Sequence, residues 1–162
     1  MHVVAVAIRG KRMQWVTRKN VKVDRVACPW LIKRFIDPHA EFLFVAEEEL
    51  LETAKTGPIP FDAPRVAGVK LNHRGDRCTF EAIIEDYKLS APGLEGLALI
   101  VRAADVRGQE HVALEGMGLR AIATGFATMN LSDPERLERG FPIYDALLQY
   151  VRQSNQERKG IL

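Results

Sequence analysis

Residues 24–38 decide the fold and read DRVACPWLIKRFIDP. Four apolar residues share one stripe at helical spacing: Leu31, Ile32, Phe35 and Ile36. We expect the helix to begin at Pro29, because proline is favoured at the first helical position and breaks a helix interior. This places Cys28 at the cap position, and Asp37-Pro38 ends the element.

Outward from this helix, residues 13–17 and 41–45 are typical of strands, and 66–72 is a weaker third candidate. Further helices are predicted by periodicity and capping signals at these ranges: 47–55, 80–87, 94–104, 118–129 and 142–151. Ser132 and Glu135 have the capping-box spacing. The sequence therefore predicts an α+β fold, a mostly helical single domain of about six helices with a small β-sheet. No βαβ alternation is visible.

Length and composition set further limits. The chain has 162 residues, 47% hydrophobic and 27% charged, which fits one globular domain. A net charge of +2 is too small for nucleic-acid binding by bulk charge. The apolar run 3–8 is too short to span a membrane, and its basic residues follow it, unlike a secretory signal. We expect a cytoplasmic protein with no membrane contact, an N-terminal extension at 1–12 and a domain at 13–162.

The two cysteines both lie at predicted helix starts. A helix N-terminus carries partial positive charge, and arginines flank both cysteines, so we expect a lowered thiol pKa. A thiolate could bind a metal or act as a redox nucleophile, which makes Cys28 a candidate catalytic residue. His73 lies five residues before Cys78, across Gly75.

Cys28, His73 and Cys78 are therefore a candidate ligand set for a transition metal ion, either Zn or Fe. A fourth ligand could come from one of three acidic residues: Asp24, Asp105 or Glu115. The alternative is that both cysteines are buried and inert, since Cys28 falls on the apolar side of its helix.

Arginines near the cysteine segments suggest a second kind of ligand. Arg25, Arg34 and Arg74 are candidate oxyanion-binding residues, because guanidinium groups and helix N-termini suit tetrahedral anions such as sulfate or chromate. The alternative is ordinary solvated surface charge. Trp30 and Arg34, four apart, are expected on the face opposite the apolar stripe as a surface cation–π pair.

Common catalytic signatures are absent from the sequence. It has no phosphate-binding glycine loop, no Gly-x-Ser-x-Gly elbow and no His-Glu-x-x-His helix. Hydrolase and nucleotide-binding functions therefore lose their usual support.

Several blocks together form a longer signature. They are QWVTR (14–18), KVDRVACPWLIKRFIDP (22–38), EFLFV (41–45), GPIPFD (57–62) and HRGDRCTF (73–80), with weaker matches at 100–105 and 144–147. Over about residues 13–152 the chain resembles the chromate-resistance (ChrB-like) protein family, in the form of its C-terminal-type domain.

The resemblance implies a part in bacterial chromate resistance. In longer relatives this unit is the C-terminal part of a chromate-responsive transcriptional regulator. About a dozen residues precede the signature here, so we do not expect direct nucleic-acid binding by this chain alone. The residues Cys28, His73 and Cys78 all fall inside signature blocks.

Three functional hypotheses follow. The first is a domain that binds a metal ion or an oxyanion such as chromate, as a sensor or accessory unit. The second is a redox enzyme that uses a thiolate or a bound metal, for chromate reduction or oxidative-stress detoxification. The third is a non-catalytic interaction domain, a homodimer packed through the helix that carries Gly118 and Gly125.

Overall fold

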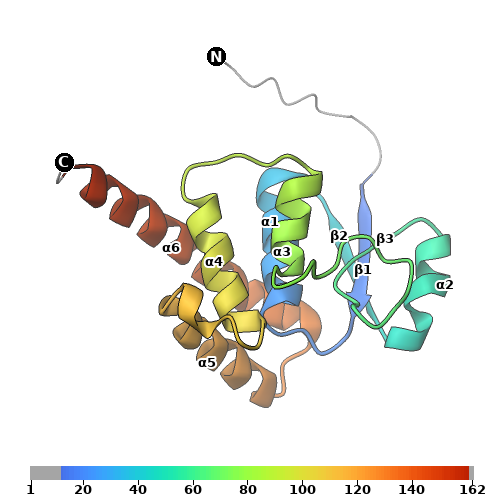
Figure 1. Ribbon diagram of the computed structural model, residues 1–162. Helices are drawn as coiled ribbons and strands as arrows, with labels where there is room; N and C mark the ends of the chain where they lie inside the picture. Colours follow the sequence, from blue (N-terminus) through green and yellow to red (C-terminus); the bar gives the residue numbers. More distant parts are fainter. Residues whose placement is uncertain (1–11, 161–162) are drawn as a thin grey trace.

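Three short parallel strands form one sheet in the order β2-β1-β3 (Figure 1). The computed structural model describes residues 12–160. Along the chain the elements are β1 (Gln14–Arg18), α1 (Asp24–Phe35), β2 (Glu41–Val45), α2 (Leu50–Lys55), β3 (Ile59–Pro60), α3 (Thr79–Asp86), α4 (Leu94–Asp105), α5 (Glu115–Thr128) and α6 (Asp133–Gly160). Single 3₁₀ turns at Glu47–Glu49 and Glu110–Val112 precede α2 and α5. The predicted α+β class, with six α-helices and a small sheet in the described part of the chain, is confirmed.

The sheet contains a βαβ unit, which the sequence reading missed. Strands β1 and β2 are parallel neighbours, in register from Gln14 with Glu41 to Arg18 with Val45, and α1 forms the connection between them. Parallel neighbours need such a crossover. Strands of five residues give too short a pattern of apolar and polar residues for this unit to be predicted from the sequence. In Figure 1 the sheet lies between α2 on one side and the helices α1 and α3 on the other.

The predicted start of α1 at Pro29 is wrong. The helix begins at Asp24, so Pro29 lies inside it and Cys28 is one turn into the helix rather than at its cap. The internal proline removes one backbone hydrogen bond. Burial of α1 offsets this loss, since every residue from Val26 to Ile32 is buried.

Two other boundaries also differ from prediction. Residues 66–72 form turns rather than a strand, because Gly68 adopts a left-handed φ of 92°, and only Leu71 forms an isolated bridge, with Phe61. The third strand is Ile59–Pro60 instead. The last helix does not start at Pro142 but runs through it from Asp133.

The remaining helical predictions are confirmed, as α2, α3, α4 and α5. The capping box before α6 is present: Ser132 N–H donates to Glu135 Oε2 at 2.8 Å, and Glu135 N–H donates to Ser132 Oγ at 3.3 Å. No helix within residues 12–160 has an apolar segment long enough to cross a membrane. The expected extension at 1–12, and the apolar run 3–8 within it, lie outside the described residues except for Arg12.

Trp30 occupies the centre of the helical core, contrary to the surface position predicted for it. Its side chain is fully buried, and its ring packs against those of Phe80 and Tyr144, with centroids 6.3 and 6.0 Å away. The indole Nε1 donates a 2.8 Å hydrogen bond to Asp145 on α6. Arg34 donates to the same carboxylate, so the two residues share an acceptor rather than a cation–π contact.

Candidate metal centre

His73 lies at the centre of three carboxylates. Its Nε2 atom is 3.1 Å from Asp105 Oδ2, 3.4 Å from Asp24 Oδ2 and 3.4 Å from Asp62 Oδ1. We call these four residues the His73 cluster. They come from the start of α1, the residues after β3, the connection to α3 and the end of α4. In Figure 1 the starts of α1 and α3 and the end of α4 meet at the lower end of these helices.

Asp24 is the most deeply buried member, at 1% exposure. Its carboxylate accepts hydrogen bonds from the backbone N–H groups of Thr79 (2.7 Å) and Phe80 (3.1 Å), at the start of α3. The segment before it is fixed by α6, because Tyr144 Oη donates to the Val23 carbonyl at 3.0 Å. The first residue of α1 is thereby held against the positive end of α3.

Asp62 lies two residues after the end of β3 and has a left-handed backbone, with φ 50°. This conformation is uncommon for a residue other than glycine, and such strain concentrates at functional sites. Its Oδ1 accepts a 2.8 Å hydrogen bond from Thr79 Oγ1, and its Oδ2 lies 3.3 Å from Arg25 Nε. The carboxylate is therefore fixed on both sides.

The connection between β3 and α3 brings His73 to the cluster. The Asn72 side chain ties it down by accepting from Ala63 N–H (2.8 Å) and donating to Ala63 C=O (3.0 Å). Immediately after His73, Arg74 and Arg77 pair their backbones around Gly75, whose φ is 61°. These two constraints flank the imidazole and set its direction.

Asp105, the last residue of α4, is the most open carboxylate of the cluster. Its side chain is 20% exposed and that of His73 27%, whereas Asp24 and Asp62 are almost fully buried. Solvent therefore reaches the cluster along the His73–Asp105 edge.

The charges of the cluster depend on one another. The hydrogen bond with Asp105, and then those with Asp24 and Asp62, raise the pKa of His73 to about 12. Burial raises the pKa of Asp24 to about 7, and the Asp105 charge adds to this effect while His73 opposes it. Burial also acts to raise the pKa of Asp62, but hydrogen bonds from His73 and Thr79 and the Arg25 charge outweigh it and leave the pKa below its ordinary value. At neutral pH His73 is positively charged.

The donor set and its spacing fit a metal ion. Within the described residues, Asp24, His73 and Asp105 are the side chains that each offer a ligand atom within 4.8 Å of the others. The three separations from His73 Nε2, 3.1 to 3.4 Å, exceed the roughly 2.7–2.9 Å of a strong charged hydrogen bond. Around an ion with bonds of about 2.0–2.2 Å, adjacent ligand atoms are roughly 3.0–3.5 Å apart.

The two cysteines do not join this set. Cys28 Sγ donates to Asp24 Oδ1 and Cys78 Sγ donates to Glu81 Oε2, each at 3.4 Å, and both residues are fully buried. The lowered thiol pKa that the sequence predicts is wrong: burial, followed by the charge of Asp24, raises the pKa of both thiols well above the ordinary value. Cys78 does lie at a helix start, as the cap residue of α3, but desolvation outweighs the helix dipole.

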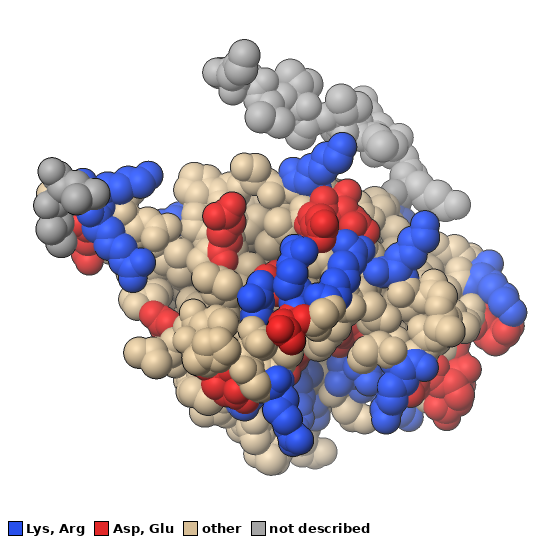
Figure 2. Space-filling view, viewed as in Figure 1, with Lys and Arg blue, Asp and Glu red and all other residues tan. Residues whose placement is uncertain are grey.

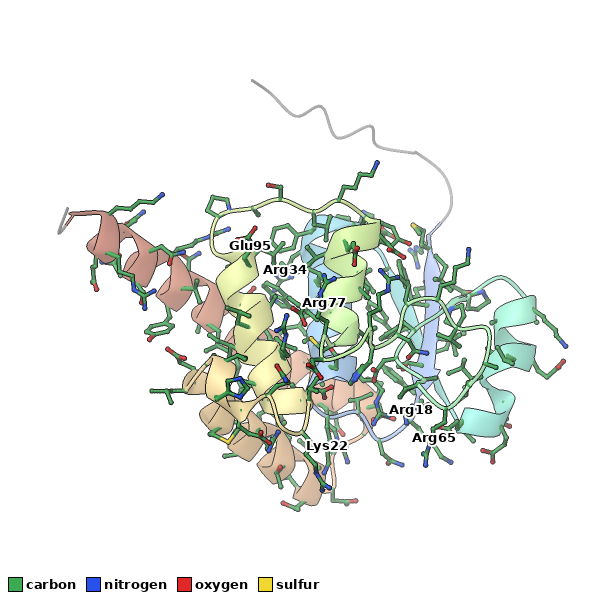
Figure 3. All side chains as sticks on the ribbon, viewed as in Figure 1. Arg18, Lys22, Arg34, Arg65, Arg77 and Glu95 are labelled. Carbon is green, nitrogen blue, oxygen red and sulfur yellow. The ribbon has the colours of Figure 1, made fainter. Side chains whose placement is uncertain are left out.

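The three candidate oxyanion-binding arginines each face a carboxylate of the protein. Arg25 pairs with Asp62, Arg34 with Asp145, and Arg74 with Glu85 and Asp86. On the face shown in Figure 2, Lys and Arg side chains are interspersed with Asp and Glu. Arg18 and Arg65 lie together at one end of β1 in Figure 3, where both pair with Glu47.

Sequence reasoning found part of this centre. It proposed His73, and it named Asp24 and Asp105 as candidate additional ligands, but Glu115 instead accepts a 2.7 Å hydrogen bond from Tyr150 Oη. It did not single out Asp62. Parallel sheets commonly place ligand-binding groups at the carboxyl ends of their strands, but β3, which ends two residues before Asp62, was not predicted, so this signal was missing.

Comparisons with known proteins identify the family. Residues 15–151 match the family model described as ChrB, C-terminal domain. The chain is 35% identical over 135 residues to Protein ChrB of Cupriavidus metallidurans, covering 83% of this chain and 39% of that protein. The chain thus spans about two-fifths of this relative, and no solved structure matches it. On this match and on the signature blocks that carry it, the chain belongs to the ChrB C-terminal domain family.

Proposed function

We propose that this chain is an ion-binding domain for chromate resistance, in which Asp24, His73 and Asp105 hold a divalent transition metal ion. The ion would serve a sensing or accessory role. The observation that carries the proposal is the convergence of one imidazole and three carboxylates, from four separate segments, on a largely buried point.

The chemistry of the donors favours a cation over an anion. Carboxylate oxygens and an imidazole nitrogen suit borderline ions such as Fe²⁺ and Zn²⁺. In the ion-free protein the His73 proton balances the carboxylate charge, and a bound cation would replace that proton. Partly exposed Asp105 and His73 give the ion a route from solvent.

Oxyanion binding stays a prediction with less support, because Arg25, Arg34 and Arg74 already face carboxylates. A redox enzyme that depends on Cys28 as a thiolate is also less favoured, since the buried sulfur has a raised pKa. Redox chemistry at a bound metal would use the His73 cluster itself.

Titration calorimetry of the untagged protein with Zn²⁺, and with Fe²⁺ under anaerobic conditions, tests the proposal. We expect one site, with affinity reduced at least tenfold in His73→Gln and Asp105→Asn, because loss of even an outer-shell partner costs about 10–100-fold. Asp86→Asn, on an exposed ion pair with Arg74, is the matched control and should bind as the wild type does. Absence of a site for either ion, or equal binding by all variants, would refute the proposal.

A further inference from the structure

Helix α5 is joined tightly to the end of α4. Gly116 lets the two backbones approach, because a Cβ there would lie 2.5 Å from Ala103 Cβ and 2.9 Å from Ala104 N. Arg120 reaches back to the final turn of α4, donating to Ala104 C=O at 2.7 Å and to Ala103 C=O at 3.4 Å. The C-terminal carbonyls of one helix are thereby held by a side chain of the next.

The residue that follows these carbonyls is Asp105, a member of the His73 cluster. Asp105 Oδ2 faces His73, and its Oδ1 accepts a 3.4 Å hydrogen bond from Asp24 N–H. Any displacement of this end of α4 toward or away from the cluster must therefore displace Arg120 and α5 with it.

The rest of α5 is held loosely. Only Gly116 and Leu119 of this helix are buried. An apolar pocket remains between its inner side and the α1 and α6 residues Val26, Ile143 and Tyr144. Large apolar residues remain exposed on or next to this helix: Met117 (40%), Ile122 at the pocket (42%) and, just beyond the helix, Met129 (51%). A Cβ on Gly118 or Gly125 would meet nothing within 4 Å, so these two glycines face open space.

We propose that α5 reports the occupancy of the metal centre, with Arg120 as the residue that transmits it. This inference rests on the proposed ion site. A bound cation would draw Asp105 toward Asp24 and His73 and so fix the position of the end of α4. Through the Arg120 contacts, α5 would then pack more closely against the residues that line its apolar pocket. Ion binding can favour this arrangement only by binding it more tightly than the loose one.

Hydrogen–deuterium exchange measured by mass spectrometry, with and without Zn²⁺, tests the coupling in the full chain. With Zn²⁺ we expect exchange in residues 106–128 to slow by roughly 5–150-fold, the usual range for coupled sites. Residues of α2, on the far side of the sheet, should exchange at an unchanged rate.

Substitution of the transmitting residue separates coupling from binding. In Arg120→Gln, Zn²⁺ should still bind by calorimetry, but it should no longer protect residues 106–128. Arg120→Lys, which keeps the charge but cannot reach both carbonyls, should behave similarly and serves if the first variant does not fold. Glu110→Gln removes only the negative charge that lies 3.2 Å from Arg120 and should keep the wild-type response.

The outcomes are distinct. Zn²⁺ binding with unchanged exchange in 106–128, or with full protection in the Arg120 variants, overturns the coupling and leaves the proposed ion site standing. Failure of wild-type protein to bind Zn²⁺ or Fe²⁺ overturns both. Binding accompanied by protection that depends on Arg120 supports both.

Discussion

The carboxylate of Asp24, the first residue of α1, accepts a 2.7 Å hydrogen bond from the backbone N–H of Thr79, the first residue of α3. The next amide, Phe80 N–H, donates to the same side chain at 3.1 Å. Asp24 thus satisfies two of the unpaired N–H groups that every helix start carries, although it is distant in sequence. The same carboxylate belongs to the His73 cluster, so one buried side chain serves both the fold and the proposed site.

Removal of this carboxylate should weaken the fold strongly. We expect Asp24→Ala to lower the free energy of unfolding by about 3–5 kcal/mol, because it leaves buried N–H groups and a charged His73 without their partner. Urea denaturation in the absence of metal measures the effect. Asp76→Ala, at an exposed position in the same connection, should change stability by less than about 0.5 kcal/mol. An Asp24→Ala protein as stable as Asp76→Ala would contradict the role given to this contact.

Stability of the metal-free protein should depend on pH through His73. Its pKa is about 12 in the folded state against 6.5 ordinarily, so its contribution is full below pH 6.5 and is lost as the pH rises toward 12. The raised pKa of Asp24 also makes stability fall with rising pH, between about 4 and 7. We expect unfolding free energy to be on the order of 2 kcal/mol lower at pH 8.5 than at pH 6.5.

Substitution of His73 tests whether its imidazole causes this fall in unfolding free energy with rising pH. In His73→Gln, thermal or urea unfolding should show a smaller loss of stability between pH 6.5 and 8.5, since glutamine does not titrate and only the Asp24 contribution remains. His111→Gln, in the 3₁₀ turn before α5, is the control and should keep the wild-type slope. A loss of stability in His73→Gln as large as that of the wild type would show that His73 does not cause it.

The helices were predictable from the spacing of apolar residues, because in an amphipathic helix this spacing shows which face is buried. The stripe Phe80, Ile83, Ile84 and Tyr87 correctly gave α3, with Cys78 just before it. The start of α1 was not predictable in this way. Proline preference pointed to Pro29, but the contacts of Asp24 with α3 fix the helix start at Asp24.

The candidate site shows the same division between local and long-range information. Signature blocks drew attention to His73, yet its partners come from three other segments, and nothing local marks Asp62 as one of them. Predictions for the cysteines failed where they depended on exposure. A helix start lowers a thiol pKa only when the sulfur remains solvated, and both sulfurs lie in the core.

The burial of both thiols predicts slow chemical labelling. Burial raises the pKa of Cys28 and Cys78, so little thiolate is present at pH 8, and neither sulfur is exposed. Reaction with a disulfide reagent such as DTNB should be at least roughly 1,000-fold slower in native protein than in denaturant, because it requires unfolding. Rapid modification of either cysteine in native protein, with the other as the internal comparison, would restore the case for a reactive thiolate.

A pair of glycines in α5 offers the sharpest test of the α4–α5 packing. Gly116 lies against Ala103, where a Cβ would approach to 2.5 Å, whereas a Cβ on Gly118 would meet nothing within 4 Å. Both are helical, so alanine improves helix propensity equally at each, by about 1 kcal/mol. We expect Gly118→Ala to stabilise the protein by roughly that amount. Gly116→Ala should instead destabilise it, by about 1–3 kcal/mol, because overpacking outweighs propensity.

Urea unfolding of both variants, in the absence of metal, provides the comparison. Because the two positions share a helix and a substitution, the difference between their unfolding free energies isolates the contact with α4. Equal effects at both positions would mean that α5 does not rest on Ala103. The rigid link between α5 and Asp105 would then be lost, and with it the route by which an ion at His73 could move the helix.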